Sequence, residues 1–211
     1  YSLEQINPFT SCIGVNNFSA SINTNLGGTP GKQNSTFDTL PDQKTPSLIS
    51  VDLISSDSLL LFFDEYLDTN SVKTATYLLS NMSPVFSVNN IAPNFQSVLL
   101  VLNTPLDSGV IVTLTVSNLL DCAGNTIQGN NATQVVLSNN PSYRDIVINE
   151  FLADPSPTTG LPESEFIEIY NASSKVFNLK GWKVGDNSTL ASLKNYIFKP
   201  NEYLVLCKEE L

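Results

Sequence analysis

Histidine is absent from this 211-residue sequence, and that absence removes several classes of catalytic site. Without an imidazole the chain cannot build a Ser-His-Asp or Cys-His nucleophilic site, or a zinc site that uses histidine. It also lacks a G-x-S-x-G turn, a phosphate-cradling loop and a dinucleotide-binding fingerprint. The glycine-rich stretch at 27–32 contains a lysine, but Pro30 interrupts it and a linker turn is the favoured interpretation. We therefore expect no enzyme.

Basic residues are scarce as well. Ten Lys and Arg residues face 20 Asp and Glu residues, which gives a formal net charge of −10 with no basic cluster. Binding of nucleic acid or of an anionic lipid surface requires clustered basic side chains, so neither partner is expected. There is no apolar run of about 18 residues, which predicts no membrane insertion. Residues 1–30 lack the features of a signal peptide, so we expect the sequence to begin inside a longer protein.

Helical periodicity is almost missing, whereas apolar residues alternate with polar ones in short bursts. Val112, Leu114 and Val116 are the clearest case. A short helical turn within 68–80, capped by Asp68 or Thr69, is the one exception that we expect. The predicted strands are 48–54, 58–63, 85–89, 97–102, 110–116, 133–137, 146–151, 165–170, 176–179, 182–184 and 203–207. The fold class is therefore all-β, with sheets stacked so that one face of 58–63 is covered.

Composition divides the chain into three parts. Residues 27–46 are rich in Gly, Pro and polar residues, and 138–142 form a second such break. We expect a leading piece at 1–36, a linker and complete domain at 37–142, and a trailing piece at 143–211. The abundance of Ser, Thr and Asn is typical of secreted β-proteins, which predicts an extracellular or cell-surface location.

The middle part resembles the bacterial Ig-like domains of surface-layer and other exported proteins. Two segments carry the resemblance: the run LLLFFDEYLD at 59–68, a strand followed by acidic residues and Leu-Asp, and the turn DCAGN at 121–125.

The trailing part resembles the start of a lamin-tail domain. The segments are EFIEIYN at 165–171, LKGW at 179–182 and FKPNEYLVL at 198–206. The two resemblances together imply two Ig-like β-sandwich units. Asn171 is expected to adopt a left-handed turn after its strand, and Gly181 to form a tight bend before Trp182. Trp182 is predicted to pack in a core and not to form a sugar-binding platform.

Segments 18–21 and 27–35 resemble the closing part of a lamin-tail-like unit. This resemblance implies that 1–36 completes the sheet begun by 143–211, within one molecule or in a strand-exchanged dimer, because open sheet edges leave backbone groups unpaired. Such pairing would bring Cys12 towards Cys207, the bridge that we expect if one forms. The alternative is three separate buried thiols, since no spacing matches a CxxC motif.

Carboxylates are the remaining candidates for chemistry. Glu150, Asp154 and Glu163 are weak calcium candidates, because calcium accepts clustered oxygen ligands. Their spacing matches no known calcium loop, and solvated surface charge is the favoured interpretation. Glu165 and Glu168 are predicted to lie on opposite faces of one strand, which argues against a joint site.

Three functional hypotheses follow. The first is a non-catalytic structural or interaction module of a large exported or cell-surface bacterial protein, with other domains of the same chain and protein or glycan ligands as partners. The alternative is a calcium- or carbohydrate-binding accessory module of a secreted enzyme. A hydrolase that uses two converging carboxylates is the third. No cofactor other than calcium is expected.

Overall fold

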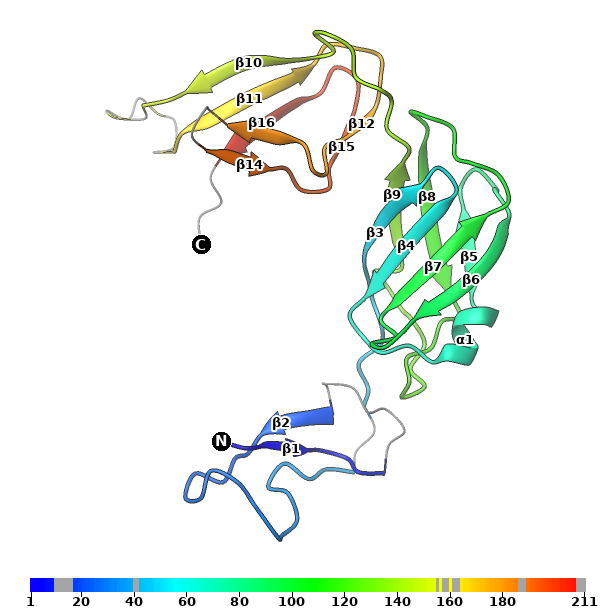
Figure 1. Cartoon of the computed structure of the whole chain (residues 1–211), viewed down its shortest axis with the longest axis vertical. Coiled ribbons are helices and arrows are strands. Elements are labelled where there is room, and N and C mark those ends of the chain that lie inside the picture. The colour runs from blue at the N-terminus through cyan, green and yellow to red at the C-terminus, as the bar shows by residue number, and fades with distance from the viewer. Residues whose placement is uncertain are drawn as a thin grey trace. The chain divides into compact units, whose positions relative to one another are not determined.

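The computed structural model describes residues 1–9, 17–39, 42–154, 156, 160, 164–185 and 189–207. Nearly all of its regular structure is antiparallel β-sheet, and a single short helix occurs among the described residues (Figure 1). Contacts divide the chain into two compact units, one formed by 1–105 with 112–134 and the other by 106–111 with 135–211. The prediction of an all-β, Ig-like fold is confirmed.

Seven strands form a sandwich in the middle of the sequence, as Figure 1 shows. One sheet has the order β3-β4-β7-β6 and the other the order β5-β8-β9. The strands are β3 (Leu48–Ser55), β4 (Ser58–Phe63), β5 (Thr76–Leu79), β6 (Val85–Ile91), β7 (Ser97–Leu102), β8 (Ile111–Ser117) and β9 (Ala132–Val136).

Alternation along the strands builds the core of this sandwich. In β4 the buried face consists of Leu59, Leu61 and Phe63, which selects one of the two faces that the sequence left open. The same period of two buries three side chains in β7 and three in β8. Because successive side chains point to opposite sides of a sheet, each strand supplies one apolar face, and the two sheets bury these faces against each other.

The helix α1 (Thr69–Thr74) connects β4 to β5, and Asp68 caps it by accepting a 2.7 Å hydrogen bond from the Ser71 backbone N–H. This cap agrees with the prediction for the segment 68–80. The helix ends at Thr74, however, and the residues that follow form β5 instead of a further turn. Pairing of Leu79 with Leu114 on β8 decides this, because the strand gains a sheet partner that a helical turn would lose.

The chain enters and leaves the sandwich at opposite ends. The Leu48 N–H, where β3 begins, donates a 2.8 Å hydrogen bond to the Asn130 carbonyl, just before β9 begins. The chain then runs the length of β9 before it leaves the sandwich. A strand advances about 3.3 Å per residue, so the exit lies roughly 20 Å from the entry.

The second unit is built on a three-stranded sheet of order β10-β11-β16. Its members are β10 (Ile146–Leu152), β11 (Phe166–Asn171) and β16 (Tyr203–Cys207); β12 (Phe177–Asn178) pairs with β15 (Ile197–Phe198), and β13 (Lys183–Gly185) with β14 (Leu190–Ser192). Ile169, Phe177, Leu179 and Phe198 form the buried core.

Trp182 packs against this core, with its ring centroid 5.9 Å from that of Phe177, as predicted. Gly181 has φ of +79°, the bend that was expected before the tryptophan.

The leading part forms a small hairpin of β1 (Leu3–Gln5) and β2 (Phe18–Ala20). The segment that follows β2 lies against β1, where the Ser2 N–H donates to the Gly27 carbonyl and the Asp38 N–H donates to the Ile6 carbonyl. No helix within the described ranges is long and apolar enough to span a bilayer.

Replacement of Leu100, which is fully buried in the central strand β7, tests the two-sheet core. We expect Leu100→Ala to lower the free energy of unfolding by about 2–5 kcal/mol, because it removes buried methyl groups and leaves a cavity. Leu78→Ala on the edge strand β5, where the side chain is half exposed, is the control and should cost well under half as much. Urea denaturation followed by circular dichroism measures both; equal losses would contradict the burial pattern.

Candidate functional site

A lysine holds the segment that precedes the sandwich. The Lys44 ammonium lies 3.0 Å from Asp64 Oδ2 and 2.5 Å from Glu65 Oε1, and the Glu65 side chain is buried. Asp64 also accepts a 2.7 Å hydrogen bond from the Ser47 N–H. Lys44, Asp64 and Glu65, with Ser47, are called the Lys44 clasp below.

The turn at 121–125 completes the Lys44 clasp from another part of the chain. The Asn125 amide donates to the Asp42 carbonyl at 2.9 Å, to the Lys44 carbonyl at 3.2 Å and to Asp121 Oδ2 at 2.9 Å. The buried Asp121 carboxylate accepts from the Asn125 N–H as well, at 2.8 Å, which orients the amide. Both segments that carried the Ig-like resemblance therefore converge on the incoming linker.

Hydrogen bonds that the Lys44 ammonium donates to the two carboxylates raise the pKa of Lys44 to about 12, with Glu65 contributing more than Asp64. A pKa raised in the folded state means that the clasp contributes its full stability below the ordinary value of 10.5 and loses it as the pH rises towards 12.

We expect Lys44→Met to lower the free energy of unfolding at neutral pH by about 1–3 kcal/mol, because the buried Glu65 carboxylate loses its cation. The difference from the wild type should shrink as the pH rises from 10.5 to about 12. Urea titrations across this range measure the effect. Lys73→Met, an exposed lysine of α1, is the control and should change little; a loss of similar size there would argue against the clasp.

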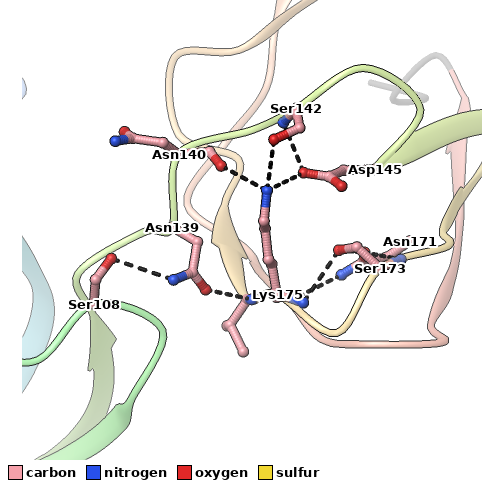
Figure 2. Close-up of polar contacts among 9 residues, drawn as sticks. Ser108, Asn139, Asn140, Ser142, Asp145, Asn171, Ser173 and Lys175 are labelled. Carbon is pink, nitrogen blue, oxygen red and sulfur yellow. Dashed lines mark hydrogen bonds and ion pairs between the residues drawn. The ribbon is translucent and has the colours of Figure 1, made fainter.

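A second lysine holds the segment that follows the sandwich (Figure 2). The Lys175 ammonium donates to Asp145 Oδ2 at 2.7 Å, to Ser142 Oγ at 2.8 Å and to the Asn140 carbonyl at 3.1 Å. The Lys175 hydrogen bond and the Ser142 N–H lower the pKa of Asp145, so this carboxylate is ionised at neutral pH. These four residues are called the Lys175 clasp.

Asn139 extends the Lys175 clasp by making two hydrogen bonds with the backbone of Val176, as a paired residue of a β-strand would. Its N–H donates to the Val176 carbonyl at 3.0 Å, and its side-chain Oδ1 accepts from the Val176 N–H at 2.9 Å. Its amide nitrogen lies 3.4 Å from Ser108 Oγ (Figure 2). Gly109 permits this approach, because a Cβ there would lie 2.3 Å from Asn139 Oδ1.

Asn171 supports the loop that carries Lys175. It is fully buried, and its amide donates to the carbonyls of Lys175 at 2.8 Å and Lys199 at 2.9 Å. Its Oδ1 accepts from Ser173 Oγ at 2.7 Å. Asn171 is not among the residues with positive φ, so the predicted left-handed turn is wrong. The residue serves its loop through side-chain hydrogen bonds instead of backbone conformation.

A buried carboxylate organises the leading part. Glu4 Oε1 accepts from Thr29 Oγ1 at 2.6 Å, and Oε2 accepts from the N–H and Oγ of Ser35, each at 2.7 Å. Burial alone would raise the pKa of Glu4, but the hydrogen bonds from Thr29 and Ser35 outweigh it and hold the pKa at about 2. The glycine-rich stretch at 27–32 is thus tied to β1 by this carboxylate.

Because the folded pKa of Glu4 is depressed, its contribution to stability is present above the ordinary value of 4.5 and is lost as the pH falls towards 2. We expect amide protection at Ser35 and Thr36 to fall across this range in hydrogen-exchange NMR. Glu4→Gln should reduce the protection already at neutral pH and abolish its acid dependence. Glu165→Gln, at an exposed site, should reproduce the wild-type profile; an unchanged profile in Glu4→Gln would refute the assignment.

The calcium candidates do not form a described site. Glu150 and Asp154 are exposed, and Glu163 lies outside the described residues. Within the described part of the chain, no group of three or more His, Cys, Asp or Glu residues could hold a metal. Glu150 does pair directly across the sheet with Glu168, which accepts a 2.6 Å hydrogen bond from the Asn149 amide. The calcium prediction stays a prediction.

The bridge between Cys12 and Cys207, which was the pairing expected if one disulfide forms, is not present. Cys207 is a free, exposed thiol at the end of β16, whereas Cys122 is disulfide-bonded. Cys12 lies outside the described residues. Sequence spacing alone could not decide the pairing, because a bridge depends on the distance between Cβ atoms in the fold.

An open groove of about 580 Å³ lies beside α1, β5 and β6. Lys73 is the one charged residue of its lining, and the exposed Met82 and Phe86 flank it. The lining mixes apolar and polar side chains, with one positive charge and no pair of reactive groups.

The fold and these sites define a chain of Ig-like β-modules whose connecting segments are held by side chains. Residues 139–210 match the family model of the lamin tail domain, which covers less than half of the chain. This match confirms the lamin-tail resemblance of the trailing part and includes Asn139 and the Lys175 clasp. The Ig-like family of the middle part and the lamin-tail-like nature of 1–36 stay predictions.

Two solved structures are similar to this chain at 14% identity. The crystal structure of the S-layer protein rSbsC(31-844) has a TM-score of 0.40 over 78% of this chain and 32% of that chain. The crystal structure of the N-terminal part of the bacterial S-layer protein SbsC has a TM-score of 0.41 over 79% of this chain and 45% of that chain. The chain therefore spans less than half of either structure. Comparison with curated protein sequences gives no match.

Proposed function

We propose that this chain is a non-catalytic structural module of a large exported or cell-surface protein, in which Ig-like units act as spacers. The observation that carries the proposal is the pair of lysine clasps. A flexible tether needs no such contacts, whereas a spacer that sets the reach between domains gains from connecting segments with few accessible conformations.

Basic residues are the less abundant charged type in this chain, so their placement in both clasps is informative. Ten basic residues are available against 20 acidic ones, yet a lysine contacts each segment that borders the sandwich. Lys44 lies on the first segment, and Lys175 reaches the second from the loop between β11 and β12. Ion pairs on an exposed surface contribute little, but Glu65 is buried and Asp145 is mostly buried, which strengthens each pair. Hydrogen bonds to backbone carbonyls at Asp42, Lys44 and Asn140 then fix the path of the chain itself.

The proposal is tested at the second connecting segment by limited proteolysis with a protease of broad specificity. Lys175→Met should speed cleavage within 138–145 by about tenfold, since the loss of charged hydrogen bonds worth at least about 1.5 kcal/mol raises the open population by that factor. Lys183→Met, an exposed lysine of β13, is the matched control and should be cleaved like the wild type. Equal rates in all three proteins would remove the physical basis of the spacer role.

A ligand-binding role makes a different prediction for calcium. A spacer does not need the ion, so we expect millimolar CaCl2 to leave the Tm of the wild type unchanged in a thermal-shift measurement, with MgCl2 as the control. Binding to the folded state alone would raise the Tm in proportion to the logarithm of the calcium concentration. A rise that EDTA reverses, and that Glu150→Gln reduces, would favour the calcium-binding module over the spacer.

A further inference from the structure

The states of two cysteines single out a role for the third. The sequence contains three cysteines, Cys12, Cys122 and Cys207. Cys122 is disulfide-bonded, whereas Cys207 is a free thiol. A disulfide joins two cysteines, so within one chain the partner of Cys122 has to be a cysteine other than Cys207. Elimination leaves Cys12, which lies outside the described residues.

Cys122 belongs to the turn at 121–125, which the sandwich holds by several contacts. The Cys122 N–H donates a 2.8 Å hydrogen bond to the Tyr66 carbonyl. On one side of it the Asp121 carboxylate is buried and accepts a 2.8 Å hydrogen bond from the Asn125 N–H. The Cys122 side chain itself is half-buried. A bridge to this residue therefore attaches its partner to a turn that the fold already holds in place.

The leading part is connected to the same turn by hydrogen bonds and a short length of chain. The Ile6 carbonyl accepts from the Asp38 N–H at 3.1 Å, and the Asp42 carbonyl accepts from the Asn125 amide at 2.9 Å. Asp38 and Asp42 are four positions apart, which limits the distance between their Cα atoms to about 14 Å. This limit applies to every orientation of the leading part.

Cys12 has enough chain on either side of it to reach the turn. The Ile6 N–H donates to the Asn17 carbonyl at 2.8 Å, so the connection that contains Cys12 starts and ends beside Ile6. Six positions separate Cys12 from Ile6, which allows a reach of about 20 Å. A disulfide needs its two Cα atoms about 4.4–6.8 Å apart. The connection is thus long enough to follow the linker to the turn at 121–125.

We infer that Cys12 and Cys122 form a disulfide, which attaches the leading part to the sandwich covalently in addition to the Lys44 clasp. In its formation the two thiols lose two protons and two electrons, and a disulfide oxidant receives both electrons and leaves as two thiols. Such bridges persist in oxidising compartments, which agrees with an exported protein. The inference does not depend on the spacer role, because proteolysis at 138–145 reads the other connecting segment.

The bridge has two consequences for the molecule. It encloses the linker and the strands from β3 to β8 in one covalent loop, and closing a long loop stabilises a fold by constraining its unfolded chain. It also keeps the leading part attached when the backbone is cut within the linker, since the cut lies inside the loop. A reductant removes both effects and leaves the Lys44 clasp as the remaining attachment.

Peptide mapping of the full chain tests the pairing. The protein is exported to the bacterial periplasm, its free thiols are blocked with iodoacetamide, and it is digested with trypsin without reduction. Lys32 and Lys73 lie between the two cysteines, so trypsin separates them unless they are bridged. We expect one linked pair that contains Cys12 and Cys122, together with alkylated Cys207. Three alkylated cysteines, or any linked peptide that contains Cys207, would overturn the inference.

Urea denaturation with and without dithiothreitol tests the consequence. Cys12→Ser should raise the unfolded-to-folded ratio at a given urea concentration by at least about tenfold, whereas the control Cys207→Ser should match the wild type. Dithiothreitol should shift the wild type and Cys207→Ser to the midpoint of Cys12→Ser and leave Cys12→Ser unchanged. A midpoint in Cys12→Ser equal to that of the oxidised wild type would contradict the stabilising bridge.

Discussion

The apolar face of a β-sheet has to be covered, and the three parts of this chain meet that constraint to different degrees. In the sandwich the two sheets cover each other, and Leu59, Leu100 and Leu114 are fully buried between them. In the lamin-tail unit Ile169 is buried with Phe177 and Phe198, whereas Ile148 and Phe151 on β10 are exposed. In the β1–β2 hairpin the apolar face is bare. The stable fold and the open surfaces of the molecule follow from the same requirement.

Electrostatics then determines how the parts are connected. The chain is strongly acidic, so a lysine placed among carboxylates finds partners readily, and Lys44 and Lys175 each bind more than one oxygen. Asn125 and Asn139 add backbone hydrogen bonds that a charge alone could not direct. The segments between the modules are thus held locally by short polar contacts. The buried asparagine and aspartate side chains have a structural role here, although residues of these types can be mistaken for a catalytic or metal-binding site.

Alternation of apolar residues is a local property, and for that reason the strands could be predicted from the sequence. The ranges 58–63 and 97–102 agree with β4 and β7 at both ends, and Asp68 caps α1 as expected. The short strands β5, β14 and β15 were missed, because two to four residues carry too little periodicity to be distinguished from a turn. The lamin-tail segment was recognisable because its aromatic and glycine residues lie in one continuous stretch of sequence.

The sequence by itself therefore determined the all-β class, the strand pattern, the core role of Trp182 and the acidic surface, all of which depend on neighbours in the chain. The tertiary structure decided what depends on distant pairs. It brought Lys44 to Asp64 and Asn125, tied Glu4 to Ser35 and placed Glu150 opposite Glu168. It also left Cys207 free, although Cys207 was the partner expected for Cys12 if a bridge formed. Hydrogen bonds, ion pairs and disulfides act over a few ångströms, and spacing along a sequence does not specify which residues the fold brings that close.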